Sequence, residues 1–263
     1  MAKNITFEHP INERTRLLLR LAHLFDQLSV FQPREEEVDS RVAVNVLLQI
    51  SAILSRSDIK SEVIKELERH MTNLVRISQH SDVDMSRLDS VVSQLEHNLS
   101  GLHNISCQLG QELRDHELLK SIMQRTSIPG GSCDFDMPVY NLWLQQSAKI
   151  RCSQLKEWMA PLEPLQNSAA LLIDLIRTSS RPVKEVAEQG FFQQSLDRKI
   201  PVQMLRVSIP VRLGLIAEVS GGKHRFSVRF LKVDSFKERP TQTTESVTFE
   251  LTKCVFIESA KPR

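Results

Sequence analysis

Few residues in this chain have the types and spacing needed for chemistry, and the first candidate is a glycine pair followed by a lysine. Gly221-Gly222-Lys223 is followed by His224, whereas a phosphate-binding loop needs GxxxxGK and then Ser or Thr, between a strand and a helix. No glycine stands five residues before Gly222, and the next segment alternates like a strand. We therefore interpret the two glycines as a hairpin turn.

A second candidate is the carboxylate pair Asp134 and Asp136, which lies in the irregular stretch 127–138. No histidine or further carboxylate lies nearby in the sequence to complete an acid–base site. Asp136 stands just before Pro138, where a helix can begin, so we predict that it caps that helix. An enzyme with a pocket near this loop remains an alternative.

Metal and thiol chemistry have weak support. The histidines show no HxxxH or HExxH spacing, and the four cysteines (Cys107, Cys133, Cys152 and Cys254) form no CxxC pair. We expect reduced, buried cysteines, of which only Cys133 in the irregular loop is worth a reactivity test. The sequence thus predicts no metal, no cofactor and no enzymatic activity.

The segment RFSVRF, which begins at Arg225, resembles loosely an RNA-recognition strand. Its alternation places Phe226, Val228 and Phe230 on one face, which favours a buried core face over exposed base-stacking aromatics. Arg225 and Arg229 then face outward. We do not expect nucleic acid as a partner, although a nucleic-acid-binding regulator remains the alternative function.

The first two thirds of this chain is predicted to be mainly α-helical. Up to about residue 180 the apolar residues recur at helical spacing, with Asn12 as a predicted N-cap and Pro161 and Pro164 as breaks. Asp84 is predicted to cap a later helix. The helices that we expect cover 12–30, 39–54, 59–78, 84–102, 105–126, a segment after Pro138 that contains Trp143, and a central, buried helix within 162–180.

From residue 181 the apolar residues alternate every second position, which predicts three to five antiparallel strands. The fold class is α+β, an N-terminal helical bundle followed by a C-terminal antiparallel β-module. We predict domains over 1–180 and 181–263, joined if a strand near residues 4–8 pairs with the C-terminal strands. Residues 181–263 contain fifteen Lys and Arg against nine Asp and Glu, whereas 1–180 contain nineteen against twenty-three.

The uneven charge makes the basic residues the best remaining functional signal. Arg206, Arg225 and Arg229 stand opposite apolar neighbours on the predicted strands, and Arg16 and Arg20 lie on adjacent turns of the first helix. Such residues either solvate a surface or form a groove for an acidic peptide, because arginine pairs well with carboxylates. No apolar stretch is long enough to span a bilayer, so we expect a cytoplasmic protein without a membrane partner.

Two stretches, FEHPINERTRLLLRL (7–21) and SIPGGSCDFDMPVYNLWL (127–144), resemble the ZapD family of bacterial cell-division factors. DLIRTSS (174–180) and RFSVRF fit the same family, and the resemblance extends from about residue 6 to about residue 251.

The resemblance implies a non-enzymatic homodimer with an α-helical domain and a β-domain. Proteins of this family bind the C-terminal tail of the tubulin-like division protein FtsZ and crosslink its filaments, so it implies a cytoplasmic location at midcell. Family members use basic surface residues for that tail. The partner-binding candidates are therefore Arg16, Arg20, Arg114, Arg225, Arg229 and Arg206.

Overall fold

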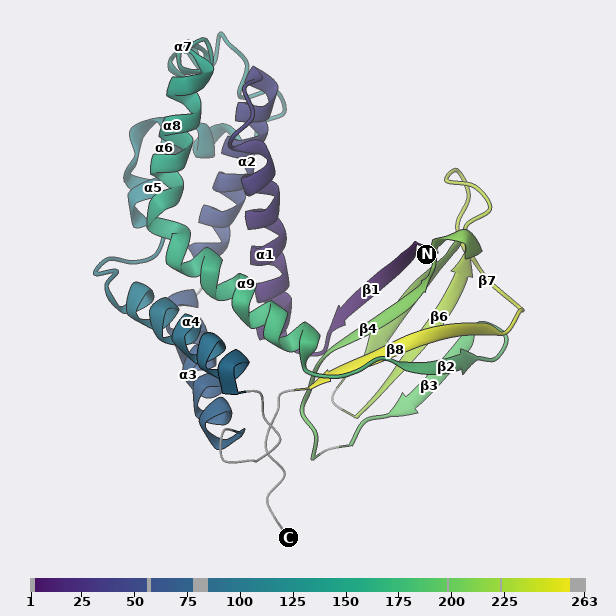
Figure 1. Ribbon diagram of the computed structural model, residues 1–263. Helices are drawn as coiled ribbons and strands as arrows, with labels where there is room; N and C mark the ends of the chain where they lie inside the picture. Colours follow the sequence, from purple (N-terminus) through teal and green to yellow (C-terminus); the bar gives the residue numbers. More distant parts are fainter. Residues whose placement is uncertain (1–2, 56–57, 78–84, 198, 223, 256–263) are drawn as a thin grey trace. The chain divides into compact units, whose positions relative to one another are not determined.

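The computed structural model describes residues 3–55, 58–77, 85–197, 199–222 and 224–255 (Figure 1). Helices occupy most of the chain up to Thr178, and all strands but the first follow them. The α+β fold class predicted from the sequence is therefore confirmed. The predicted cap Asp84, the turn residue Lys223 and the last eight residues lie outside the described ranges.

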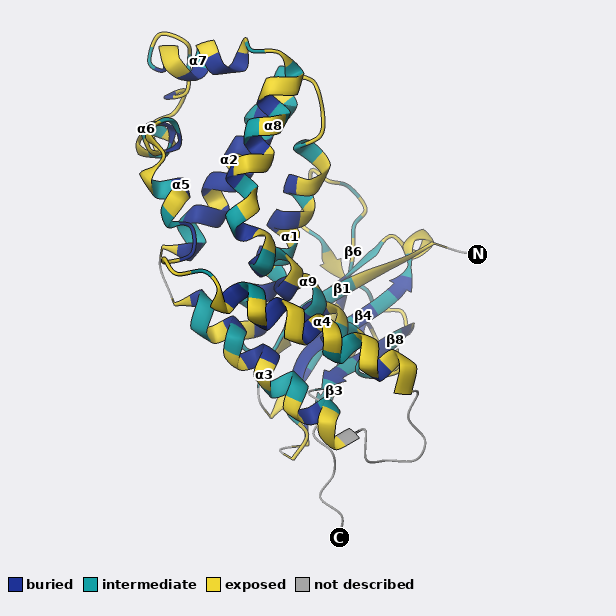
Figure 2. Cartoon of the chain, turned by 60° about the vertical axis from the view of Figure 1, so that its left-hand side comes forward, coloured by how far each residue is buried: buried dark blue, intermediate teal, exposed yellow. Residues whose placement is uncertain are grey.

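The helical part consists of amphipathic helices with short connections. Figure 2 shows dark-blue buried positions between yellow exposed positions along α4. The α-helices are α1 (Glu13–Phe31), α2 (Glu37–Leu54), α3 (Ile59–Ile77), α4 (Met85–His103), α5 (Gln111–Asp115), α6 (Glu117–Arg125), α7 (Pro138–Leu144), α8 (Ala148–Met159) and α9 (Glu163–Thr178).

The start of α1 follows the prediction. The Asn12 side-chain oxygen accepts a hydrogen bond of 2.8 Å from the Thr15 backbone N–H, which satisfies one of the amide groups that lack a partner in a first helical turn. The helix then buries Leu18, Leu21 and Leu28, each at most 2% exposed. One apolar stripe thus directs the helix onto the core.

The continuous helix expected over 105–126 is wrong. Residues 104–110 form a loop, and the rest divides into α5 and α6 at His116, whose backbone is extended (φ −72°, ψ 115°). The His116 ring packs edge-on against Trp158 at 5.1 Å between centroids. Because no proline or glycine marks residue 116, the break could not be read from sequence periodicity.

The predicted cap of α7 is also wrong. Met137 occupies the N-cap position without a side-chain hydrogen bond. Asp136 instead pairs with Arg125 at 3.1 Å and accepts a hydrogen bond of 3.3 Å from the Cys133 thiol. The loop carboxylate thus ties its own loop to the end of α6.

The strands form two four-stranded antiparallel sheets, one in the order β1-β4-β8-β2 and the other containing β3-β6-β5, with β7 also paired to β6. Strand β1 pairs with β4 along its whole length. The strands are β1 (Asn4–Pro10), β2 (Val183–Ala187), β3 (Phe191–Ser195), β4 (Val202–Pro210), β5 (Leu215–Gly221), β6 (Arg225–Lys232), β7 (Thr241–Gln242) and β8 (Val247–Val255).

The two sheets pack face to face around an aromatic core. The Phe249 ring of β8 lies 5.1 Å from Phe230 of β6 and 5.3 Å from Phe192 of β3. Phe226, Val228 and Phe230 are at most 1% exposed, so the predicted core face is confirmed. The number of C-terminal strands expected, three to five, was too low because short segments such as Phe191–Ser195 lack a clear alternation.

The chain divides into two compact units, Met1–Leu17 with Ile173–Arg263, and Leu18–Leu172. The first unit holds the sandwich, including β1, and the second holds most of the helices. The predicted division into domains over 1–180 and 181–263 stays a prediction. Among the described helices, none alone is long and apolar enough to cross a membrane; α2 and α3 pass such a test only as a bent pair.

Candidate peptide-binding face

The outer face of the β3-β6-β5 sheet carries polar and basic side chains in rows set by strand register. Opposite Arg229 of β6 stand Phe191 on β3 and Glu218 on β5. One row along, Ser227 stands between Gln193 and Ser220. Because these residues alternate with the buried phenylalanines, all their side chains point away from the core.

Arg225 and Arg229 are the cations of this face. Both are exposed, and they stand about 13 Å apart along one side of β6. Although Glu218 faces Arg229 in register, neither guanidinium forms an ion pair with any residue that the structure describes. Two arginines are therefore left to bind carboxylates from another molecule.

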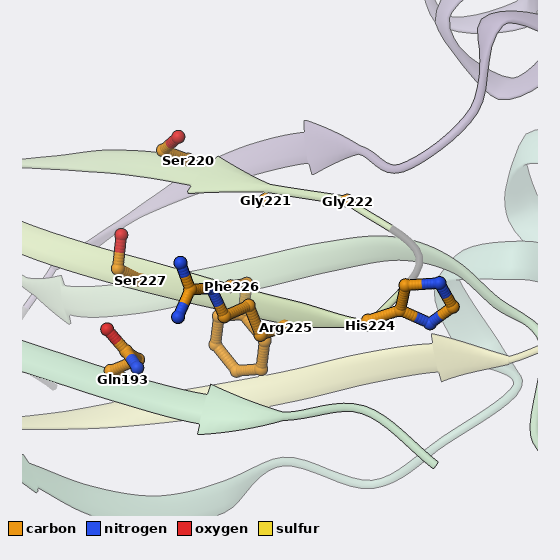
Figure 3. A pocket seen from close by; sticks show the side chains of 8 residues that line it. All are labelled: Gln193, Ser220, Gly221, Gly222, His224, Arg225, Phe226 and Ser227. Atoms are coloured by element: carbon orange, nitrogen blue, oxygen red, sulfur yellow. The ribbon is translucent and has the colours of Figure 1, made fainter. Parts of the chain in front are cut away.

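A groove of about 460 Å³ crosses this face at the β5–β6 hairpin (Figure 3). Figure 3 shows Gln193, Ser227 and Ser220 on three adjacent strands, with Arg225 and His224 near the hairpin. The lining combines a cation with hydroxyl and amide groups. These side chains can donate hydrogen bonds to an extended polar chain and can accept hydrogen bonds from it.

The hairpin that shapes the groove depends on Gly221. A Cβ atom at this position would stand 2.7 Å from the Phe226 Cβ, and the Gly222 N–H donates a hydrogen bond of 3.1 Å to the Arg225 carbonyl. In the described residues, the hairpin turn predicted from the two glycines is confirmed.

Arg16 lies near the same hairpin through His9. Burial and the positive charge of Arg16 lower the pKa of His9, while a hydrogen bond with the Gly221 backbone opposes that shift. Arg16 itself pairs with Glu13 at 3.2 Å, and its side chain is 38% exposed. Arg16 belongs to the same compact unit as the strand arginines, because that unit contains Met1–Leu17 together with Ile173–Arg263.

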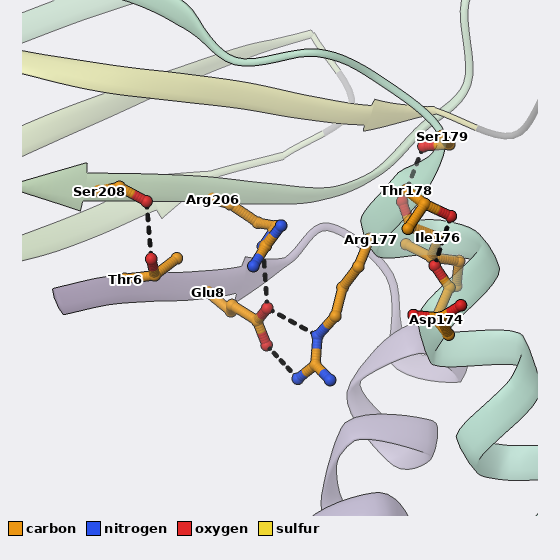
Figure 4. Close-up of polar contacts among 9 residues, drawn as sticks. All are labelled: Thr6, Glu8, Asp174, Ile176, Arg177, Thr178, Ser179, Arg206 and Ser208. Carbon is orange, nitrogen blue, oxygen red and sulfur yellow. Dashed lines mark hydrogen bonds and ion pairs between the residues drawn. The ribbon is translucent and has the colours of Figure 1, made fainter. Parts of the chain in front are cut away.

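Arg206 is engaged in an ion pair within the fold. Its Nε donates to Glu8 at 3.0 Å, and Arg177 binds the same carboxylate through two bonds of 2.9 and 2.8 Å (Figure 4). Burial alone would raise the pKa of Glu8, but hydrogen bonds and charge from Arg177 and Arg206 outweigh it and lower that pKa. The cluster ties β1 to β4 and to the end of α9.

Arg20 and Arg114 belong to the helical unit. Arg20 is exposed and borders a groove of about 370 Å³ with Leu24, Ala52 and Ile53. Arg114 is half-buried and donates to the Leu109 carbonyl at 3.2 Å and to the side-chain oxygen of Gln111 at 2.9 Å. Arg20 is thus available to a ligand, whereas Arg114 already holds its own loop.

The remaining candidates from the sequence are a metal site, the loop carboxylates Asp134 and Asp136, and the cysteines. In the described ranges, no group of three or more His, Cys, Asp or Glu is arranged to hold a metal ion. Asp134 lies 3.7 Å from Arg41, so each loop carboxylate has a cationic partner. Cys254 is buried, and burial raises the pKa of its thiol to about 11. Cys107 is exposed, which corrects the expectation of buried cysteines.

Comparison with known proteins decides the family. The model of the ZapD family, described as cell division protein, matches residues 19–229. The chain belongs to the ZapD family. The Cell division protein ZapD of Methylococcus capsulatus is 41% identical over 255 residues, covering 97% of this chain and all of that protein. Those of Chromobacterium violaceum and a Janthinobacterium species are 38% and 36% identical over 252 residues, covering 96% of this chain and the whole of each relative.

ZapD membership assigns this chain to cell division, and it agrees with the family resemblance of the sequence motifs. The matched range ends at residue 229 and includes both Arg225 and Arg229. Sequence reasoning found these arginines but missed Phe191, Gln193 and Ser220. Their place beside β6 depends on strand pairing, which no local pattern specifies.

Proposed function

We propose that this ZapD-family chain is a non-enzymatic cell-division factor that binds the C-terminal tail of FtsZ and crosslinks FtsZ filaments. It acts in the cytoplasm at the division site and supports Z-ring assembly. The observation that carries the proposal is the outer face of β6, where Arg225 and Arg229 are exposed and form no ion pair with a described residue.

Arginine suits this task because its planar guanidinium can bind a carboxylate through two parallel hydrogen bonds. Arg20 with its apolar groove and Arg16 near the hairpin are further candidates. Arg206 and Arg114 come second, since each already makes intramolecular hydrogen bonds. Each exposed pair contributes only about 0–1 kcal/mol, so one tail binds weakly.

Weak contacts give firm bundling if the protein is bivalent. A homodimer with twofold symmetry presents two equivalent faces. A filament displays many tails, so the second face meets a high effective concentration of tail once the first is bound. Crosslinking therefore needs a dimer but no strong single site.

Co-sedimentation with FtsZ filaments tests the function. In GTP and low salt, the full-length protein should pellet with FtsZ and increase the bundled fraction. Raising the salt shortens the screening length, which is about 10 Å at 0.1 M, and should release the protein. An unchanged FtsZ pellet at low salt would overturn the crosslinker proposal. A generic DNA or RNA gel shift would favour the nucleic-acid alternative.

A paired charge reversal tests the site. Arg225→Glu with Arg229→Glu should reduce affinity for an FtsZ tail peptide more than tenfold, because two attractions become repulsions. The matched control is Arg212→Glu with Arg239→Glu, which changes the charge equally at exposed positions of the same unit. Circular dichroism should be unchanged in both variants. Equal affinity of the two variants would move the site elsewhere.

A further inference from the structure

The edge of the face that carries Arg225 and Arg229 is formed by β3, a short strand whose neighbour in the sheet is β6. Flanking hydrogen bonds of 2.8 Å show which β3 residues bond to β6: Phe230 N–H donates to the Gly190 carbonyl, and Leu196 N–H donates to the His224 carbonyl. Bonded residues alternate along an antiparallel pair. Phe192 and Gln194 therefore belong to the ladder between these two bonds.

The remaining residues of β3 direct their backbone groups to the opposite side. Phe191 N–H bonds to the Glu188 carbonyl. Gln193 and Ser195 are exposed, and within the described chain their N–H and C=O groups have no backbone partner at that edge. Open edges of this kind accept an additional strand.

We propose that the FtsZ tail, through a segment that carries a carboxylate, binds as an extended strand added to the free edge of β3. The inference rests on the proposed function and deepens it by assigning the binding mode. Backbone hydrogen bonds to Gln193 and Ser195 would hold the tail at the edge, and the arginines of β6 would select its charge. The charge of the face fits an acidic partner rather than a second copy of this basic edge.

Strand register adds a specificity. The added strand would lie roughly 10 Å from β6, two strand spacings away. Ser195 stands opposite Arg225, so only a small side chain separates this guanidinium from the tail. Phe191 stands opposite Arg229 and is 38% exposed. Glu188 already pairs with the outer edge of Phe191, so the added strand would pair with Gln193 and Ser195. The site therefore fits a carboxylate beside Ser195.

A proline scan of the edge tests this mode with a synthetic FtsZ tail peptide and the full-length protein. Gln193→Pro removes an outward N–H without removing a bond to β6, a position where strands tolerate proline. It should weaken peptide binding about tenfold, the value of roughly one backbone hydrogen bond. Gln193→Ala removes the same side chain but keeps the N–H, so it is the reference against which the tenfold loss in the proline variant is measured.

A second measurement covers the case in which the proline variant does not fold. Peptides carrying one N-methyl group at successive positions are titrated against the wild-type protein. Strand addition predicts that affinity falls at every second position, because alternate N–H groups face β3. A flat profile, or a folded Gln193→Pro variant with unchanged affinity, would overturn strand addition. Co-sedimentation with FtsZ would still support the crosslinking function in that case, so the two failures are distinguishable.

Discussion

At the scale of single residues, the arginines of this chain differ in what surrounds them. Arg206 and Arg177 share the Glu8 carboxylate, whereas Arg225 and Arg229 have no carboxylate partner among the described residues. All four carry the same charge in the sequence. Only the surroundings separate arginines that stabilise the sandwich from arginines that we assign to a partner.

The substitution Glu8→Gln tests whether the ion pairs of Arg177 and Arg206 with Glu8 stabilise the fold. Losing the carboxylate leaves two guanidinium groups beside a neutral amide, which should lower the free energy of unfolding by about 1–3 kcal/mol at neutral pH. The pKa of Glu8 is lowered in the folded protein, so its contribution is complete above the unfolded-state pKa of about 4.3. It is lost as the pH falls through the lower, folded value.

Urea unfolding of both proteins between about pH 7 and pH 3 measures the effect. The difference between wild type and Glu8→Gln should be constant near neutrality and shrink on acidification. Glu13→Gln is the control, because Glu13 forms a single ion pair at the exposed start of α1. A pH-independent difference would contradict the assigned role of the carboxylate.

At the scale of elements, one buried cation organises the connections around α8. Arg151 is 6% exposed. Its guanidinium donates to Ser40 Oγ and to the Leu144 carbonyl, each at 3.0 Å, and to the carbonyls of Glu35 and Gln146. These groups belong to α2, to the residues before it and to the end of α7, so one side chain joins three segments.

Arg151→Met should destabilise the helical unit by about 2–4 kcal/mol, because buried carbonyl groups lose their donors while the stem volume is kept. Lys149→Met is the matched control, since Lys149 is an exposed cation on the same helix. The midpoint of chemical unfolding compares the two variants. Equal midpoints would show that the Arg151 bonds contribute little.

The strands and helices also show which features of the fold and of the candidate site could be predicted from the sequence. The period-two pattern of RFSVRF fixed which β6 side chains are buried, because a strand has only two faces. The same pattern could not show that Phe191–Ser195 lies beside β6, since strand pairing depends on distant residues. Likewise, the arginines of the candidate site could be predicted, whereas their neighbours and the break at His116 could not.

At the scale of the whole molecule, the sandwich is assembled from both ends of the chain. Its unit combines Met1–Leu17 with Ile173–Arg263. The boundary that the change in sequence pattern suggests, near residue 180, leaves β1 apart from its partner β4. Fragments cut at that boundary therefore separate a strand pair.

A comparison of fragments tests this organisation. Residues 181–263 alone lack β1 and expose the edge of β4, so this fragment should aggregate and melt without cooperativity. A chain that joins 1–17 to 173–263 through a Gly/Ser linker should remain soluble and give a β-rich circular dichroism spectrum. Cooperative melting of 181–263 alone would show instead that β1 is dispensable.

The position of β8 has a consequence for synthesis on the ribosome. This strand is the last in the described chain, yet it lies inside its sheet between β4 and β2. Helices emerge early and can fold during translation, but the sheet lacks an inner strand until β8 has left the exit tunnel. A chain that terminates prematurely before Val247 would therefore carry the arginines of β6 without a completed sandwich to present them. Because β8 follows β6 in the chain, the binding face that we propose is supported by a complete sandwich only some time after its arginines have been synthesised.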